Sequence, residues 1–377
     1  MSTEGGARAW MEVQAGALRR NLNTIRERVG TDVGLIPMVK ADGYGLGVRR
    51  CVGILEPLDP RGYGVATVEE GEALRDQGVG RPVFVLSPVP TGALARAVES
   101  DLTVAVSDVA SLQRLQEVAT RRGVAASFHL DVDTGMGRSG LDWRRVEEWG
   151  ESVVALASSE SLRWTGCFTH FHSADQGDTA SIRTQWERFQ DVVTALEPPE
   201  GVLLHGCNSA AALRLPELAA GAVRPGIFLY GGRAGADLPP PEQVVSVRAR
   251  VVHVKDAPPG STVGYGATHV AGGWERWATV ALGYGDGLPR LLGNRGRVLV
   301  RGRGAPIVGR ISMDVTVVDI SGLDEVEVGD VATILGRDGA EAIELEDVAG
   351  WAETISYEIL TGFTPRLPRI WLDDGRG

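Results

Sequence analysis

Lysine is almost absent from this chain, which makes the lysine at position 40 the most informative candidate for chemistry. The sequence has 38 basic residues, and only Lys40 and Lys255 are lysines. Lys40 ends the apolar run Gly-Leu-Ile-Pro-Met-Val and is followed by Ala-Asp-Gly-Tyr-Gly. A partly desolvated amine has a lowered pKa and can act as a nucleophile that forms a Schiff base. We therefore predict a functional Lys40, against the alternative of a strand-end lysine that reaches solvent.

Two further segments could serve a small anionic ligand. Tyr44 stands among glycines that let backbone approach a ligand, and its hydroxyl can donate a hydrogen bond. Arg224 precedes Pro-Gly-Ile, at a point in the chain where loop amides of a barrel commonly hold a phosphate. Taken alone, Arg224 could equally be a salt-bridged residue at a strand end.

The histidines near the predicted strand ends could be structural residues or metal ligands. His170 and His205 each lie at or near the end of an apolar run, where a histidine is often a structural residue with satisfied hydrogen bonds. The spacing His170-x-His172, with Asp133 and Asp175 elsewhere in the chain, also occurs in metal-dependent barrel hydrolases. A metal site is kept as a rival, and our own prediction is that the site holds no metal.

Short apolar runs alternate with amphipathic stretches over the first two thirds of the chain. Most runs are short, rich in β-branched residues and flanked by Gly, Pro or Asp, which favours buried parallel strands. The predicted strands are 35–39, 64–68, 82–86, 103–106, 126–132, 164–170, 202–207 and 227–230. With helices such as 67–77 and 109–122 between them, they predict an α/β fold, a (β/α)8 TIM barrel over residues 13–236. Lys40 would then lie on the catalytic face; a doubly wound open sheet is the alternative fold.

The pattern of apolar and polar residues changes after Gly235. Three prolines, 239–241, break the chain, and segments of period two follow, separated by turn residues. These segments are 244–254, 277–282, 296–300, 307–318 and 331–335, with helical periodicity returning at 345–360. We predict a mainly β C-terminal domain over residues 237–377, joined by an N-terminal strand at about residues 8–12.

Composition narrows the class of protein. The formal net charge is −11, so the chain offers nucleic acid no broad basic field. Three widely separated cysteines provide neither a disulfide framework nor a zinc ribbon. The N-terminus has no apolar signal region, and no run of 18 uncharged apolar residues occurs. We expect a cytoplasmic protein without nucleic-acid or membrane partners.

An ordered set of motifs resembles the alanine racemase family, whose members use pyridoxal 5′-phosphate. The motifs are V-K-A-D-G-Y-G at 39–45, D-T-G-M-G-R at 133–138, F-T-H-F at 168–171, N-S-A-A at 208–211, V-R-P-G-I at 223–227, V-G-Y-G at 263–266, G-Y-G-D-G at 283–287, R-I-S-M-D at 310–314 and R-L-P-R at 366–369. The resemblance implies that Lys40 binds the cofactor covalently and that Arg224, supported by His205, faces the pyridine nitrogen. His170 would lie beside the cofactor. The phosphate would be held by Tyr44, Ser209, Gly226 and Ile227.

The resemblance also implies a second catalytic base, Tyr265, delivered across a homodimer interface to the cofactor face opposite Lys40. A tyrosine needs cationic neighbours to act as a base near neutral pH, and Arg138 is suited to that and to gripping a substrate carboxylate. Met313 would add a backbone amide to the substrate carboxylate. The substrate entrance would be lined by Tyr284 and Asp314.

The chain departs from the family pattern at two positions. Asp131 stands where many members have a carbamylated lysine that orients the arginine, and we predict that its carboxylate fixes Arg138 instead. Pro365 stands where many members have a phosphate-binding tyrosine. The predicted function is racemisation of L- and D-alanine, which supplies D-alanine for cell-wall peptidoglycan. The alternatives are a racemase of another small amino acid such as serine, or a non-catalytic barrel that binds pyridoxal phosphate.

Overall fold

The first half of the molecule is a closed parallel barrel. A computed structural model describes residues 6–373, and the strands of the barrel follow the order β2-β10-β9-β8-β6-β5-β4-β3. A parallel bridge between Met38, three residues after β2, and Gly64 of β3 closes the ring. The strands are β2 (Gly34–Leu35), β3 (Tyr63–Val65), β4 (Val83–Val85), β5 (Thr103–Val106), β6 (Ala126–Asp133), β8 (Leu162–Phe168), β9 (Leu203–Asn208) and β10 (Ala222–Arg224), with β7 (Leu141–Asp142) beside β6.

The predicted eighth strand is wrong. Residues 227–230 form a 3-10 helix, η6 (Ile227–Tyr230), and the eighth strand is β10, which ends at Arg224. Pro225 lacks an amide hydrogen, and Gly226 has φ −128° and ψ −100°, so the ladder stops there. Ile-Phe-Leu-Tyr is apolar and fully buried, and four such residues cannot distinguish a strand from a helical turn by periodicity.

Helices connect the strands of the barrel. Thr67 and Glu70 form a capping box at the start of α4, and Gly123 ends α6 in the left-handed conformation. The elements are α1 (Ala15–Val29), α2 (Lys40–Tyr44), α3 (Val48–Leu55), α4 (Val68–Asp76), α5 (Leu94–Glu99), α6 (Val109–Arg122), α7 (Val146–Ala157), α8 (Ala180–Leu196) and α9 (Ser209–Arg214).

The second half is mainly β, as predicted, with two short helices packed beside the sheet. Its longest strand, β11, pairs with β1, β14 and β18. The elements are β11 (Val245–Ala257), β12 (Thr262–Val263), β13 (His269–Val270), β14 (Glu275–Val280), β15 (Arg297–Val300), β16 (Arg303–Pro306), β17 (Thr316–Asp319), β18 (Val331–Asp338), β19 (Glu341–Ile343), α10 (Leu345–Trp351) and α11 (Ser356–Gly362). Residues 307–318, predicted as one strand, contain only a bridge at Ile307 and the start of β17.

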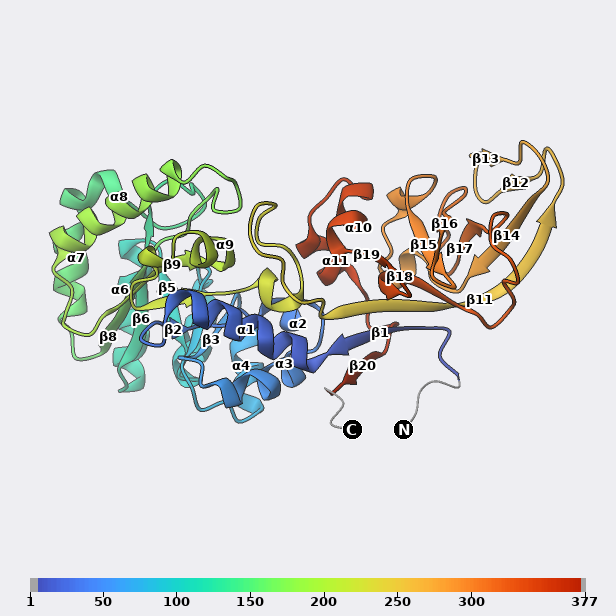
Figure 1. The fold of residues 1–377 in the computed structure, drawn as a ribbon. Coiled ribbons are helices and arrows are strands. Elements are labelled where there is room, and N and C mark those ends of the chain that lie inside the picture. Colours follow the sequence, from blue (N-terminus) through green and yellow to red (C-terminus); the bar gives the residue numbers. More distant parts are fainter. Residues whose placement is uncertain (1–5, 374–377) are drawn as a thin grey trace.

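The first and last strands of the described chain lie side by side in this sheet. β1 (Ala9–Gln14) runs antiparallel to β11 and parallel to β20 (Arg369–Leu372). β1 leads directly into α1 of the barrel, and the chain returns to the β half between η6 and β11, so the two halves are joined by two crossings of the chain (Figure 1). Residues 374–377 of the predicted second domain lie outside the described residues.

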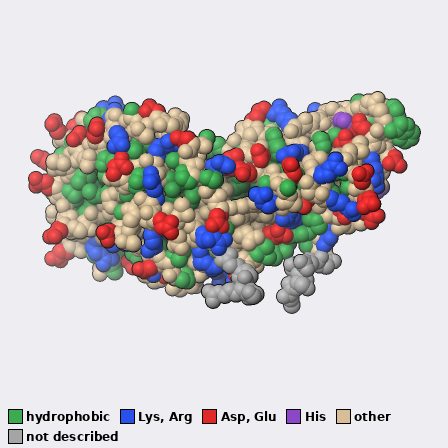
Figure 2. All heavy atoms as spheres, viewed as in Figure 1, with side chains coloured by type: hydrophobic (Ala, Val, Ile, Leu, Met, Phe, Trp, Pro, Cys, Tyr) green, Lys and Arg blue, Asp and Glu red, His purple; other side chains and the backbone are tan. Residues whose placement is uncertain are grey.

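The surface carries both signs of charge and one exposed apolar tip. Figure 2 shows acidic and basic side chains mixed over both halves, and hydrophobic side chains gathered at the end of the β half. Tyr265, Val270 and Trp274 of that end are 68%, 56% and 74% exposed. Within residues 6–373, no helix combines the length and apolar character needed to cross a membrane.

Candidate active site

Lys40 lies at the C-terminal end of the first barrel strand segment and opens a left-handed turn. Ala41, Asp42 and Gly43 have φ of 52°, 54° and 63°, and Tyr44 follows with φ 55°. Hydrogen bonds from Gly43 N to Val39 O (2.9 Å) and from Gly45 N to Ala41 O (2.8 Å) close the turn. A residue with a Cβ in this conformation costs about 1–2 kcal/mol relative to a right-handed one. Neighbouring groups must therefore hold the turn in place.

Glu70, which the sequence analysis missed, is one such group. Its Oε1 accepts the amide hydrogen of Ala41 at 2.6 Å, and its Oε2 accepts that of Ala66 at 2.7 Å. The carboxylate thus joins the turn after Lys40 to the end of the next barrel strand. The signal was present in the sequence, because Thr67 and Glu70 form a recognisable capping box at the mouth of the barrel.

The environment of Lys40 favours a neutral amine. Burial, followed by the positive charges of Arg138 and Arg224, lowers the pKa of the Lys40 amine, and Glu70 opposes them. The side chain is still exposed at the mouth of the barrel. A neutral, accessible amine is the form that can act as a nucleophile or a base.

A cup of hydroxyl and amide groups lies beside the turn. The Gly226 amide donates to Ser209 Oγ at 2.8 Å, and a Cβ on Gly226 would overlap the Tyr44 hydroxyl, so these three groups converge. Ile227 begins η6 directly after Gly226. The Tyr44 ring stacks on Tyr230 with centroids 4.4 Å apart. Burial raises the pKa of the Tyr44 hydroxyl, so this group remains a hydrogen-bond donor.

Tyr357 of α11 is a second residue that the sequence analysis missed. Its ring lies 6.1 Å from that of Tyr44, and burial raises its pKa to about 12. Pro365 is exposed and brings no hydroxyl. A protonated tyrosine beside the cup is therefore supplied by α11 and not by position 365.

Arg224 is buried and surrounded by neutral acceptors. It is 5% exposed and donates to the carbonyl oxygens of Thr169, His205 and Gly206 at 2.8, 3.1 and 3.2 Å. Its two Nη atoms also contact the Nδ1 atoms of His205 at 2.6 Å and of His170 at 3.2 Å. Burial lowers the pKa of the guanidinium to about 10, which leaves it charged near neutral pH. No carboxylate forms an ion pair with it among residues 6–373.

Two histidines extend this contact into the core of the barrel. His205 Nε2 lies 2.8 Å from Nδ1 of His129, and His129 Nε2 is buried without a hydrogen-bond partner. Burial and then the charge of Arg224 lower the pKa of His129 to about 3, and the same causes hold the pKa of His205 well below its usual value. Because Arg224 must donate to His205 Nδ1, His205 donates from Nε2, and its tautomer is fixed. His129 was not predicted as a site residue.

The predicted pair between Asp131 and Arg138 is not formed. Asp131 Oδ2 instead accepts from the hydroxyls of Ser107 and Ser139, each at 2.9 Å. The buried Asp131 carboxylate lies between Ser107, just after β5, and Ser139, on the loop after β6, whereas Arg138 on that same loop is exposed. Burial raises the pKa of Asp131 even though both serines oppose that effect.

The two histidines considered as metal ligands, His170 and His172, each contact another side chain. His170 contacts Arg224, and His172 Nδ1 lies 2.6 Å from Ser173 Oγ. Across the described part of the chain, no three His, Cys, Asp or Glu side chains come together as a metal site.

The remaining candidates form a second group on the β half. Tyr265 lies in the turn between β12 and β13, at the end of the molecule far from the barrel (Figure 1). A Cβ on Gly266 would lie 2.9 Å from Nη1 of Arg310, so a cation packs against this turn. Met313 and Tyr284 are 52% and 39% exposed, and Asp314 is exposed as well. The structure brings Lys40, Tyr44, Ser209, Gly226 and Arg224 together and leaves this second group apart from them.

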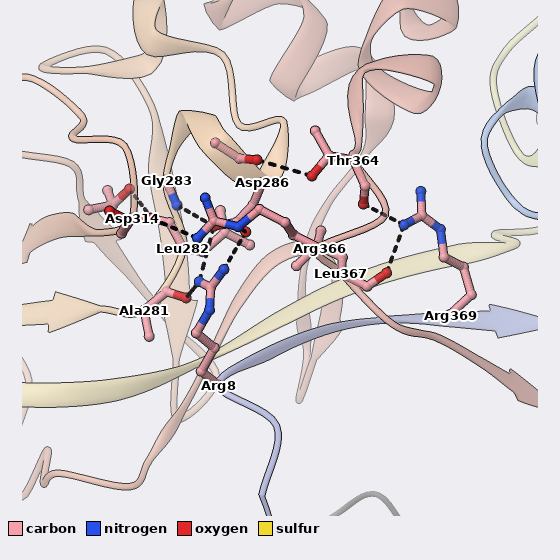
Figure 3. Close-up of polar contacts among 12 residues, drawn as sticks. Arg8, Ala281, Leu282, Gly283, Asp286, Asp314, Thr364, Arg366, Leu367 and Arg369 are labelled. Atoms are coloured by element: carbon pink, nitrogen blue, oxygen red, sulfur yellow. Dashed lines mark hydrogen bonds and ion pairs between the residues drawn. The ribbon is translucent and has the colours of Figure 1, made fainter.

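A buried ion-pair cluster holds the loops of the second group. Asp286, fully buried, is contacted by Arg8 Nη2 at 2.5 Å and by Arg366 Nε at 3.3 Å (Figure 3). Arg366 also reaches Asp314 at 2.7 Å. The amides of Tyr284 and Gly285 donate to the carbonyls of Ser312 and Met313, at 3.1 and 2.8 Å. The loops that carry Tyr284, Met313 and Asp314 are therefore one connected unit.

The fold and the site define a class of protein: a barrel with a single lysine at its mouth, a hydroxyl cup and a second, mainly β part. Family models described as "Alanine racemase, N-terminal domain" and "Alanine racemase, C-terminal domain" match residues 13–234 and 244–371. The chain is 36% identical to the alanine racemase of Halothermothrix orenii, with 96% of each chain covered. It is 36% identical to alanine racemase 2 of Bacillus subtilis, covering 97% of this chain and 95% of the relative.

Solved structures agree. A crystal structure of alanine racemase from D-cycloserine-producing Streptomyces lavendulae matches with a TM-score of 0.92 and 34% identity, covering 98% of both chains. Alanine racemase from Streptomyces coelicolor matches with a TM-score of 0.91 and 34% identity, over 97% and 98% of the two chains. The chain belongs to the alanine racemase family. The predicted family, fold class and enzyme class, an amino-acid racemase, are confirmed.

Proposed function

We propose that this enzyme interconverts L- and D-alanine with pyridoxal 5′-phosphate as its cofactor, and that D-alanine for cell-wall peptidoglycan is its product. The observation that carries the proposal is geometric: Lys40 begins the turn at the end of the first barrel strand segment, beside the cup formed by Tyr44, Ser209 and Gly226. Lys40 and the cup lie in a chain whose relatives are named alanine racemases. A cytoplasmic location remains a prediction from the sequence.

The residues present fit the cofactor. The amide of Gly226 and the hydroxyls of Ser209 and Tyr44 converge on a space that a Cβ at position 226 would invade, which suits a phosphate. Arg224 can only donate, so it suits an unprotonated pyridine nitrogen. When bound, the cofactor supplies an electron-withdrawing ring that acidifies the substrate α-carbon hydrogen.

The chain's own residues would move the proton. Lys40 would take or return the α-carbon proton on one face, and Tyr265 would do so on the other, so that each enantiomer loses its proton to one base and gains one from the other. Arg138 and the amide of Met313 would hold the substrate carboxylate. Tyr284 and Asp314 would line the way in.

We infer a homodimer with shared active sites from the separation of the two groups. Tyr265 lies on the β half, far from Lys40 of its own chain, and it is 68% exposed together with Val270 and Trp274. Exposed apolar side chains gathered at one tip are typical of a surface that another protein covers. A second copy that brings this tip to the barrel mouth would complete both sites.

The test is incubation of the purified enzyme, loaded with pyridoxal phosphate, with each L-amino acid, followed by chiral analysis. We expect D-alanine from L-alanine, and loss of both this activity and the cofactor's visible absorbance in Lys40→Ala. Turnover of L-serine at a higher rate than L-alanine would replace the substrate assignment. Full cofactor binding without any racemised product would favour the non-catalytic alternative.

A further inference from the structure

The motif R-L-P-R at residues 366–369 lies between the two groups of site residues. Arg369 reaches into the barrel half, where its Nε and Nη2 donate to the carbonyl oxygen of Gly45 at 3.0 and 2.9 Å. Gly45 closes the left-handed turn that begins after Lys40. The same guanidinium donates to the carbonyls of Phe363, Thr364 and Leu367, at 2.8, 2.6 and 2.7 Å. All acceptors of Arg369 are thus backbone carbonyls.

Arg366, three residues earlier, points in the other direction. It contacts Asp286 and Asp314, which belong to the loops of Tyr284 and Met313 (Figure 3). Thr364 adds two bonds, from its amide to Asp286 O at 3.0 Å and from its hydroxyl to Gly285 O at 3.0 Å. Residues 363–369, which we name the clamp segment, therefore contact both the Lys40 turn and the entrance loops.

Glycines make this close packing feasible. A Cβ on Gly45 would lie 2.8 Å from the carbonyl oxygen of Leu360 in α11, just before the clamp segment. A Cβ on Gly285 would overlap the Arg366 guanidinium, and one on Gly287, whose φ is 103°, would overlap the carbonyl oxygen of Gly362. The Lys40 turn and the Tyr284 loop therefore both have glycine where the backbone of α11 and the clamp segment packs against them.

We propose that Arg366 and Arg369 are positioning residues for the reaction. Arg369 holds the turn that presents Lys40, and Arg366 holds the loops that present Tyr284 and Met313. The inference rests on the proposed function for its catalytic meaning. In the shared dimer proposed above, one short segment would then align the lysine of one site with the entrance of the other.

The variants Arg369→Met and Arg366→Met separate the two roles, since methionine keeps much of the side-chain volume and removes the donors. Loss of charged hydrogen bonds is worth about tenfold or more in an equilibrium constant. Arg369→Met should weaken pyridoxal phosphate binding about tenfold while the KM for alanine stays within about twofold of the wild type. Arg366→Met should raise that KM about tenfold and leave cofactor binding unchanged. Arg369→Lys, which keeps the charge, should recover part of the loss.

Amide hydrogen exchange provides a readout that does not depend on activity. Exchange in residues 41–47 should become faster in Arg369→Met, and exchange in residues 283–287 and 312–314 should become faster in Arg366→Met. The matched control is Arg50→Met, because Arg50 lies over Trp371 and near Asp373 without bonding to the clamp segment. Its exchange and kinetics should match the wild type.

The proposal is overturned if residues 41–47 exchange at the wild-type rate in Arg369→Met. It is overturned equally if either variant speeds exchange throughout the β half, because that result describes a merely structural role. An enzyme without racemase activity would refute the proposed function, while the exchange measurement would still decide whether the clamp exists.

Discussion

The two residues proposed to move protons have different surroundings. Burial and, after it, nearby cations lower the pKa of Lys40, whereas Tyr265 is 68% exposed at the tip of the β half. A group becomes an effective base only when its neighbours match its pKa to the working pH. The neighbours of Lys40 within one chain shift its pKa in this direction.

The two-base proposal predicts an asymmetric defect in Tyr265→Phe. Turnover should fall by about 10²–10⁴, the usual contribution of a positioned proton-transfer group. Exchange of the α-hydrogen with solvent should persist for the enantiomer that Lys40 serves, expected to be D-alanine, and fail for L-alanine. Proton NMR in deuterated water measures both rates. Equal loss from both enantiomers would contradict two separate bases, and cofactor absorbance serves as the folding control.

Single residues at strand ends were the predictable part of the site. Lys40 and Arg224 both end strand segments, and the logic of the barrel's catalytic face places them in one region. His129 was missed because its role depends on which strands become neighbours, information that one strand's sequence does not contain. The capping box of Glu70 was visible in the sequence, but its bond to the Ala41 amide depends on the same neighbourhood. The Asp131 interpretation failed because Ser107, after the neighbouring strand β5, and Ser139, next to Arg138 on the loop after β6, both donate to its carboxylate.

The left-handed turn after Lys40 is the element on which the amine depends. Three of its residues carry a Cβ at positive φ, so the turn is intrinsically unfavourable. The Glu70 carboxylate offsets part of that cost through the Ala41 amide. Geometry at the reacting amine is thus maintained by a side chain from the next βα unit.

Removing this support should be reversible by glycine. Glu70→Ala is expected to lower the free energy of unfolding by about 1–2 kcal/mol, since a charged hydrogen bond is lost. Adding Ala41→Gly should restore about 1 kcal/mol, because glycine adopts this conformation without a Cβ penalty.

Urea unfolding of the single and double variants measures the loss and the gain separately. Glu69→Ala is the matched control, because Glu69 pairs with Arg96 on the surface and should contribute little. If Glu70→Ala leaves the free energy of unfolding unchanged, the carboxylate does not support the turn; if Ala41→Gly gives no gain, the Cβ of Ala41 does not strain it.

At the level of elements, periodicity located most strands and failed where the chain is both apolar and tightly turned. Val109–Arg122 matches its predicted limits because a cap and a terminal glycine mark both ends. Residues 227–230 are buried on every side, so strand and 3-10 helix share one pattern there. Residues 307–318 alternate in polarity, yet their middle part is irregular and packs against the Tyr284 loop.

The molecule as a whole should become less stable in mild acid. His129 and His205 are buried and neutral, with the pKa of His129 lowered to about 3. Below pH ~6.5 these histidines become protonated in the unfolded chain but stay neutral in the folded chain. The free energy of unfolding therefore falls as the pH falls towards 3. The expected slope is about 1.4 kcal/mol per pH unit for each histidine.

Urea unfolding between pH 7 and pH 5 tests this prediction. His129→Gln should reduce the slope of unfolding free energy against pH by about 1.4 kcal/mol per pH unit, the contribution of one histidine. His253→Gln, at an exposed position on β11, is the control. A wild-type stability that does not change over this range would show that the histidines are not held neutral.

A shared active site makes a prediction about mixed dimers. Lys40→Ala subunits lack the lysine, and Tyr265→Phe subunits lack the second base. A dimer of one with the other should regain one functional site, because an intact barrel then faces an intact β half. Differentially tagged subunits purified as heterodimers allow the measurement. Activity no greater than that of the parent homodimers would place both bases within one chain.

The pairing of β1 with both β11 and β20 has a consequence for biosynthesis. The strands of the barrel can pair as they leave the ribosome, whereas β1 emerges first and must wait for partners encoded more than two hundred residues later. A nascent chain that stops short of Arg369 would already carry Lys40 in a barrel, but it would lack the last strand and the guanidinium that binds Gly45. If Arg369 positions the Lys40 turn as proposed, translation must pass the final strand before the turn is held, and we expect a chain released before Arg369 to lack racemase activity.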